Sequence, residues 1–306
     1  PVENHLGELW NLFRFINPGL LGSKEDFNQD FAVPIEKLQD KQASQRLKKL
    51  IQPYLLRRTK SQVLSELPSR TEIILNVKLS REEMAMYEAL RKQAITKLAD
   101  SNATDGHKHL QVLTEIMKLR RACCHSKLVM PDAPIPSAKL QLFGEVLAEL
   151  LENHHKALVF SQFVDHLDII RNYLDEQSIK YQYLDGSTPA KERKKRVDAI
   201  QGGVGDVYLS SLKAGGTGLN LTAADYVIHM DPWWNPAVED QASDRAHRIG
   251  QQRPVTIYRL VTKDTIEEKI VDLHGHKRDL ADSLLEGADV SGKISTNELL
   301  KLIQER

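Results

Sequence analysis

The stretch Val207-Tyr-Leu-Ser-Ser-Leu-Lys-Ala-Gly-Gly-Thr-Gly-Leu-Asn220 places a short apolar run directly before a glycine-rich loop. The apolar run predicts a strand, and the glycines let backbone N–H groups approach a ligand that side chains would keep away. A tight turn without a ligand is the alternative. The place of the loop at a strand end favours binding, because ligands of parallel α/β sheets gather beyond the carboxyl ends of strands.

Other apolar runs surround this stretch, and helical patterns follow them. Strands without polar alternation that alternate with helices predict an α/β domain, in which helices cover both faces of a parallel sheet. Thr71–Leu79, rich in β-branched residues, predicts a further strand that leads into this domain. The runs are Ala157–Phe160, Tyr181–Leu184, Tyr226–Met230 and Val255–Val261.

The chain before about residue 135 has a charged, helical pattern. Ser80 and Glu83 form a capping box that opens a long helix, and a second helix is expected from about Leu110 to Cys124. Three prolines within Pro131–Pro136 cannot continue a helix and predict a domain boundary.

The composition excludes several classes of protein. The 306 residues are 41% hydrophobic and 27% charged, which predicts an ordinary globular protein of about two domains. Lys plus Arg and Asp plus Glu both number 42, so nucleic-acid binding must come from local patches. The adjacent Cys123 and Cys124 suit neither a disulfide framework nor zinc spacing, so we expect a reducing compartment and no metal held by this chain alone. No apolar stretch is long enough to predict a membrane span.

The segment Gln241-Ala-Ser-Asp-Arg-Ala-His-Arg-Ile-Gly-Gln251 predicts a phosphate site. Spacings of i, i+4 and i+7 place Gln241, Arg245 and Arg248 on one face of a helix. Two guanidinium groups there would neutralise charge on a transferring phosphoryl group. Spacing alone leaves a solvated basic face as an equal alternative.

Two further loops follow predicted strands. In Asp185–Pro189, Thr188 is expected to cap a helix whose first residue is Pro189, and that helix carries a basic cluster. In Asp231–Pro236, the indoles of Trp233 and Trp234 would serve core packing, nucleic-acid contact or docking of another lobe. The basic cluster, whose alternative is a solvated face, comprises Lys191, Arg193, Lys194, Lys195 and Arg196.

A phosphate loop of the form GxxxxGK[ST] is missing from the sequence. Gly287–Ile294 nearly matches, but Ile294 replaces the required hydroxyl and no strand precedes it. We therefore expect that this chain cannot complete an ATP site alone. Because Pro1–Asn4 carries no Met and leads directly into a helix-like pattern, we also expect that the chain begins inside a larger protein.

In this order, the glycine loop, Asp231–Pro236 and Gln241–Gln251 resemble the SWI/SNF-type ATPases of helicase superfamily two, which move along double-stranded DNA. Pro1–Trp10 resembles the end of that family's first RecA-like lobe, and Pro53–Lys60 its basic segment between lobes. The resemblance implies four regions: residues 1–70 as the tail of the first lobe with a helical protrusion and basic linker, 71–135 as a linker strand and second protrusion, 136–265 as the second RecA-like lobe, and 266–306 as a brace helix and C-terminal tail.

The resemblance also assigns roles to residues. Gln241, Arg245 and Arg248 match the sixth helicase motif, whose arginines reach phosphates on the opposite lobe. Candidate nucleotide-binding residues are Gly216, Gly218 and Asn220. Candidate DNA-binding residues are Arg57, Arg58, Ser161, Gln162, Gly186, Ser187, Thr188, Ser210, Lys213 and Trp233.

The expected activity is DNA-stimulated ATP hydrolysis by the complete protein, with ATP and Mg²⁺ bound mainly by the absent first lobe. Expected partners are double-stranded DNA and that lobe, in a monomer without membrane attachment. The cell compartment would be the cytoplasm in a prokaryote or the nucleus in a eukaryote. The alternatives are a strand-separating helicase of the same superfamily and, for this fragment by itself, a non-catalytic DNA-binding module.

Overall fold

The computed structural model describes residues 6–38, 40–54, 67–99, 105–132, 135–212, 220–273 and 296–304. They form two compact units. The first is a helical unit within residues 6–54 that also takes in residues 272–273 and 296–298, and the second is an α/β unit within residues 67–271 that also takes in residues 299–304. The divisions expected near residues 135 and 265 lie inside the second unit, and the separate roles of those regions stay predictions. None of the helices in the described ranges has both the length and the apolar composition that crossing a bilayer requires.

The helical unit is built from short helices, and polar side chains cap the start of two of them. Ser23 accepts a hydrogen bond from the backbone N–H of Asp26, and Asp40 accepts two, from Gln42 and Ala43. Phe27 is fully buried at the centre of this unit. The elements are α1 (Leu6–Ile16), α2 (Lys24–Phe27), a π-helical turn (Asn28–Ala32), α3 (Val33–Leu38), α4 (Lys41–Ile51) and a 3-10 turn (Gln52–Tyr54).

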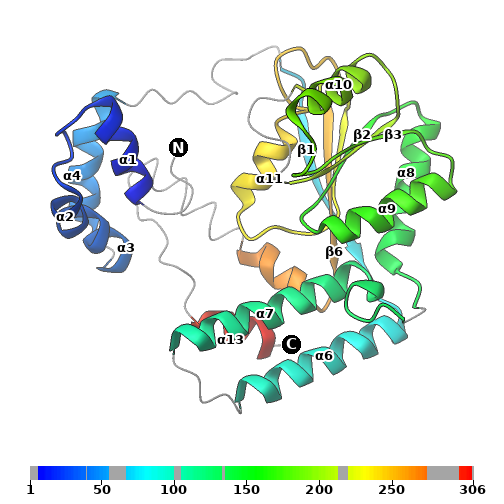
Figure 1. The fold of residues 1–306 in the computed structure, drawn as a ribbon, viewed down its shortest axis with the longest axis horizontal. Helices are drawn as coiled ribbons and strands as arrows, with labels where there is room; N and C mark the ends of the chain where they lie inside the picture. The colour runs from blue at the N-terminus through cyan, green and yellow to red at the C-terminus, as the bar shows by residue number, and fades with distance from the viewer. Residues whose placement is uncertain are drawn as a thin grey trace. The chain divides into compact units, whose positions relative to one another are not determined.

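The α/β unit contains a six-stranded parallel sheet of order β1-β6-β5-β2-β4-β3 (Figure 1). All the predicted strands are present in it. The segment expected as a linker strand is instead β1, an edge strand of this sheet that pairs with β6 from Arg70 opposite Val255 to Val77 opposite Thr262. The strands are β1 (Arg70–Val77), β2 (Ala157–Ser161), β3 (Tyr181–Leu184), β4 (Val207–Ser211), β5 (Tyr226–His229) and β6 (Val255–Thr262).

Helices cover both faces of the sheet, as predicted. Alternate residues of β2 show the two cores: Val159 packs with α8 (Ala138–Glu152) and α9 (Val164–Glu176). Leu158 and Phe160 face the opposite core, together with residues of α10 (Ala190–Gln201) and α11 (Pro236–Ser243). β2 is buried at every position, which explains its unbroken apolar sequence.

A pair of long helices, α6 (Arg81–Ala99) and α7 (Asp105–Cys124), extends from the sheet and is followed by a 3-10 turn (Ser126–Leu128) (Figure 1). The capping box of α6 is confirmed, because Ser80 N donates to Glu83 Oε2 at 2.8 Å and Glu83 N donates to Ser80 Oγ at 3.1 Å.

Two segments near the C-terminus are helical, residues 266–273 and α13 (Thr296–Gln304). Arg91 of α6 caps α13 by donating to the carbonyl oxygen of Ile303 at 3.0 Å. Residues 266–273 begin the expected brace helix. Its remainder, the near-match Gly287–Ile294 and the basic segment with Arg57 and Arg58 lie outside the described residues.

Candidate phosphate and nucleic-acid site

The predicted single helical stripe of Gln241, Arg245 and Arg248 is wrong. Helix α11 ends at Ser243, and both arginines lie in the turns that follow. Gln241 and Arg248 are exposed, whereas Arg245 is only 6% exposed, so the three side chains do not share a helix face.

Tertiary hydrogen bonds stabilise the turns that follow α11. Leu221 N donates to the carbonyl oxygen of Arg245 at 2.9 Å. The Gln251 side-chain amide donates to the carbonyl oxygens of Ala246 at 3.1 Å and Ala224 at 2.8 Å. Leu221 and Ala224 lie outside the motif, so spacing within the motif does not reveal these contacts.

Arg245 is a buried cation with few partners. Its guanidinium carbon lies 5.4 Å from the centroid of the Phe160 ring, within the range of a cation–π contact. Nη1 is buried and has no hydrogen-bond partner within the described ranges, and neither does the buried hydroxyl of Tyr208. Burial lowers the pKa of Arg245, an effect that the nearby Tyr208 opposes. An unsatisfied buried charge is costly, so an anion that reached this guanidinium would be bound favourably.

The predicted nucleotide-binding residues are described only in part. Asn220 is exposed and precedes Leu221, which is hydrogen-bonded to the Arg245 turn. Gly216, Gly218 and Lys213 lie outside the described residues, so their roles stay predictions.

The loop after β3 is held by its own side chains. Asp185 Oδ1 accepts hydrogen bonds from Ser187 N at 2.9 Å and from Thr188 Oγ1 at 3.1 Å. The bond from the Ser187 hydroxyl lowers the pKa of Asp185. Thr188 is buried and does not cap α10, because the N-cap position is Pro189 and makes no side-chain bond. Arg193 donates from Nε to the Thr188 carbonyl at 2.9 Å and so ties α10 to the loop.

The basic cluster of α10 therefore divides by function. Arg196 donates to the carbonyl oxygen of Tyr183, and with Arg193 it serves the fold. Lys191, Lys194 and Lys195 are exposed. Gly186 and Ser187 are also exposed, which keeps this end of the unit available to a phosphate backbone.

Two of the predicted DNA-binding hydroxyls are fully buried in this conformation. Ser161 Oγ donates to Asp231 Oδ1, and Ser210 Oγ donates to the carbonyl oxygen of Ser211 at 3.1 Å. Both therefore support strand ends rather than offering a surface hydroxyl. Gln162 and Trp233 are half-buried, and their contact with DNA stays a prediction.

The loop between β5 and α11 is anchored at both ends. At its start, Asp231 also accepts a hydrogen bond from Gln162 N at 3.3 Å. At its end, Trp233 N donates to Glu239 Oε1 at 2.7 Å, and Arg259 Nε donates to Glu239 Oε2 at 2.6 Å. Burial raises the pKa of Asp231 to about 6, although the Ser161 hydrogen bond opposes the shift.

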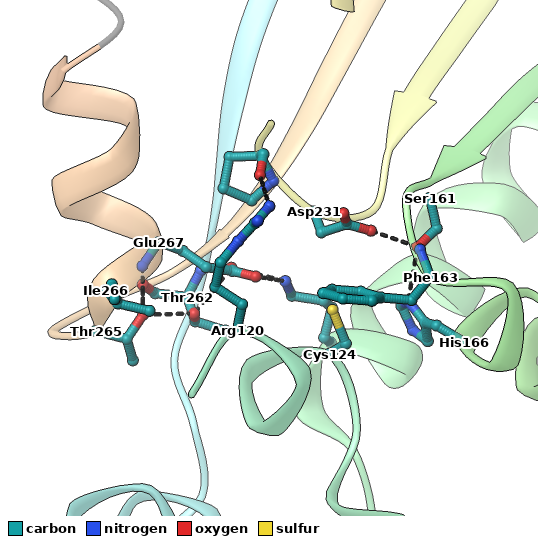
Figure 2. A network of polar contacts seen from close by, with 12 residues as sticks. Arg120, Cys124, Ser161, Phe163, His166, Asp231, Thr262, Thr265, Ile266 and Glu267 are labelled. Carbon is teal, nitrogen blue, oxygen red and sulfur yellow. Dashed lines mark hydrogen bonds and ion pairs between the residues drawn. The ribbon is translucent and has the colours of Figure 1, made fainter. Parts of the chain in front are cut away.

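A possible metal cluster lies beside this loop. Ligand atoms of Cys124, His166 and Asp231, all buried, lie within 4.8 Å of one another (Figure 2). A thiol and an imidazole do not fit Mg²⁺, which prefers oxygen ligands. The positive charges of Arg120 and Lys139 already act on Asp231, and burial raises the pKa of the Cys124 thiol. We therefore interpret the cluster as a buried charge network and propose no metal there.

Comparison with known protein families identifies the chain. A model of the SNF2-related domain matches residues 1–128, and a model of the helicase conserved C-terminal domain matches residues 138–250. The chain belongs to the SWI/SNF family. The two models match in the sequence order that the resemblance predicted.

Individual relatives agree with this assignment. An uncharacterized ATP-dependent helicase of Mycoplasma genitalium is 38% identical over 99% of this chain, which covers 29% of that protein. The human SWI/SNF-related matrix-associated actin-dependent regulator of chromatin subfamily A member 1 is 35% identical over 99% of this chain, which covers 30% of it. The SWI/SNF chain thus spans about a third of the length of these relatives.

A solved structure supports the RecA-like fold. The SWI2/SNF2 ATPase core of Sulfolobus solfataricus in complex with double-stranded DNA is 34% identical, with a TM-score of 0.62 over 99% of this chain and 62% of that one. The parallel sheet flanked by helices is the RecA-like architecture that the sequence predicted.

Proposed function

We propose that this chain is the C-terminal lobe of an ATP-dependent double-stranded-DNA translocase. The observation that carries the proposal is the buried guanidinium of Arg245, one nitrogen of which has no hydrogen-bond partner within the described residues. A phosphate oxygen is the partner that matches its charge and planar geometry. The exposed Arg248 lies three residues further along the same turns and would supply the second cation.

In this proposal the two arginines act as fingers supplied in cis. Phosphoryl transfer depends on positioning and on neutralising the charge of the transferring group, and an arginine finger contributes on the order of 10³-fold to 10⁵-fold in rate. ATP would be held mainly by the upstream first lobe. Mg²⁺, which neutralises phosphate charge when bound, would also be held there, since the clustered ligand atoms of the described residues do not suit it.

DNA contact would come from local groups on a chain of zero net charge. The exposed Gly186 and Ser187, the half-buried Gln162 and the exposed lysines of α10 offer donors to a phosphate backbone. Such contacts carry little sequence information, as a translocase that moves along any sequence requires. They also weaken as the salt concentration rises. We propose that the complete protein acts as a monomer.

The test is ATP hydrolysis by the complete protein with and without duplex DNA. Wild-type turnover should rise with duplex, and Arg248→Ala should lose most of this stimulated turnover while keeping its DNA affinity. Arg253→Ala is the matched control, because Arg253 is also an exposed arginine but lies beside Asp225, before β6. Stimulated turnover that is equal in the Arg248→Ala and wild-type proteins would remove Arg248 from the finger role.

The second candidate is a strand-separating helicase, which the helicase names of relatives favour. Labelled duplexes with single-stranded tails distinguish the two. A translocase hydrolyses ATP on blunt duplex without releasing a strand, whereas a helicase releases the strand and is stimulated by single-stranded DNA.

A further inference from the structure

Arg120 of α7 lies in a buried polar network and is not itself one of the proposed phosphate or DNA contacts (Figure 2). Its side chain is 1% exposed, and Nη2 donates to the carbonyl oxygen of Pro232 at 2.5 Å. Arg120 belongs to the helical pair that extends from the sheet, whereas Pro232 belongs to the loop between β5 and α11. The bond therefore joins two parts of the chain that are 112 residues apart.

Three aromatic rings surround the Arg120 guanidinium. Its central carbon lies 5.5 Å from the ring centroid of Trp234, 5.8 Å from that of Phe163 and 6.0 Å from that of Trp233. Each distance is within the range in which a ring attracts a cation. Two of the rings belong to the same loop as Pro232, so the flat guanidinium fixes both the backbone and the side chains of that loop.

Electrostatics keeps Arg120 charged in this position. Burial lowers the pKa of the guanidinium, and the negative charge of Asp231, at the start of the loop, opposes that shift. Asp231 is itself bound to Ser161 Oγ and Gln162 N at the end of β2. Arg120 and Asp231 thus anchor the loop from two different elements, and Glu239 anchors it from α11.

The network also reaches the helix of residues 266–273. Glu267 pairs with Lys139 at 2.7 Å, with both side chains fully buried, and accepts a hydrogen bond from Thr262 N at 2.9 Å (Figure 2). The Lys139 charge acts on Asp231, so the groups around the loop are electrostatically linked. A substitution of Arg120 is therefore expected to disturb the loop between β5 and α11 first.

We propose that Arg120 is a positioning residue for nucleotide hydrolysis. By fixing the loop 231–235, it sets the start of α11 and, through α11, the turn that carries Arg245 and Arg248. The proposal rests on the proposed function of those two arginines. Arg120 touches no reacting atom in it, and its effect is exerted through the loop.

The experiment compares Arg120→Leu with Arg121→Leu in the complete protein. Arg121 is the matched control, because it is the next residue of α7 and its guanidinium binds Asp165 and the Leu128 carbonyl rather than the loop. The readout is the ratio of duplex-stimulated to basal turnover, which does not depend on the folded fraction. We expect duplex-stimulated turnover to fall on the order of 10²-fold in Arg120→Leu, because small misplacements of a catalytic group have effects of that size, and the ratio therefore to fall toward one.

Arg120→Lys should restore part of the ratio, since an ammonium group keeps the charge and a donor to Pro232 but not the flat contact with the indoles. If Arg120→Leu does not fold, Arg120→Lys decides the question together with Trp234→Leu, and both should lower the ratio. An unchanged ratio in the variants that fold, or a loss equal to that of Arg121→Leu, overturns the proposal.

A second readout does not depend on activity. Acrylamide quenching of tryptophan emission should increase in Arg120→Leu relative to Arg121→Leu, because Trp233 and Trp234 lose the cation that packs on them. Equal quenching in the two variants overturns the proposal even if the complete protein shows no stimulation by DNA. Absent stimulation in wild type together with increased quenching would instead contradict only the proposed function.

Discussion

Two buried arginines of the α/β unit, Arg120 and Arg245, differ in how many partners the fold gives them. Arg120 donates to a carbonyl oxygen, lies near three aromatic rings and is balanced by Asp231. Arg245 lies over one ring, and its Nη1 has no hydrogen-bond partner within the described ranges. Each guanidinium has one buried nitrogen without a hydrogen-bond partner in the described ranges, Nε in Arg120 and Nη1 in Arg245, but Arg120 also donates to a carbonyl oxygen and has a buried carboxylate nearby. We propose that the fuller set of partners suits Arg120 to positioning the loop, and that the smaller set leaves Arg245 available to a ligand.

The largest difference between the Arg245 and Arg120 variants should appear in ATP turnover. Arg245→Ala in the complete protein should lose on the order of 10³-fold in DNA-stimulated ATP turnover, because a cation on the transferring phosphoryl group is removed. The loss for Arg120→Leu should be smaller, since that residue acts through the loop. Steady-state kinetics with duplex DNA measures the turnover loss of each variant. Equal losses would contradict the proposal that Arg245 contacts the phosphoryl group whereas Arg120 only positions the loop.

Thermodynamic stability should rank the two arginines in the reverse order. Arg120→Leu removes one of the two buried cations that act on Asp231, the other being Lys139, and should lower the free energy of unfolding by about 3–5 kcal/mol. Arg245→Leu removes an unsatisfied charge and should change it by less than about 1 kcal/mol. Urea denaturation of the complete protein, followed by circular dichroism, gives both values. A larger loss for Arg245→Leu would show that its guanidinium already has a full set of partners.

A pH experiment tests the surroundings of Phe160, the ring that Arg245 contacts. The His229 ring stacks on the Phe160 ring, with the two ring centroids 5.7 Å apart. Burial lowers the pKa of His229 to about 4. The unfolded chain binds a proton at His229 near pH 6.5, so wild type should lose stability as the pH falls from 6.5 to 4. The slope is at most about 1.4 kcal/mol per pH unit.

The control for that experiment is His229→Gln, which removes the titrating group. The difference in free energy of unfolding between wild type and variant should shrink as the pH falls through this window. A difference that stays constant would mean that His229 is not held neutral beside Phe160.

The smallest effect concerns anion binding. Pyrophosphate at ten times its dissociation constant should stabilise wild type by about 1.4 kcal/mol, since a ligand that binds only the native state shifts the unfolding equilibrium. Arg245→Leu should lose this stabilisation, whereas Arg121→Leu should retain it. Thermal denaturation with and without pyrophosphate measures the shift, and equal stabilisation of all three proteins would place the anion elsewhere.

Most of the fold could be predicted from local sequence. Runs such as Ala157–Phe160 are apolar at every position because both faces of the strand are buried, and their alternation with helices predicts a parallel sheet. The site was predicted less completely. Spacing placed Arg245 in a helix, but hydrogen bonds from Leu221 and Gln251 hold it in a turn. Arg120 was missed altogether, because the pair Arg120-Arg121 has the pattern of a solvated helix face.

The sequence by itself determined the strands, the capping box of α6, the family and the candidate residues, since these depend on periodicity and on motifs contained in short segments. Only the tertiary structure decided which charges are satisfied. Whether a guanidinium is buried, and what it donates to, depends on residues such as Pro232 that are distant in the chain and adjacent in the fold. The helix-to-turn change at Ser243 and the different surroundings of Arg120 and Arg245 both follow from such long-range contacts.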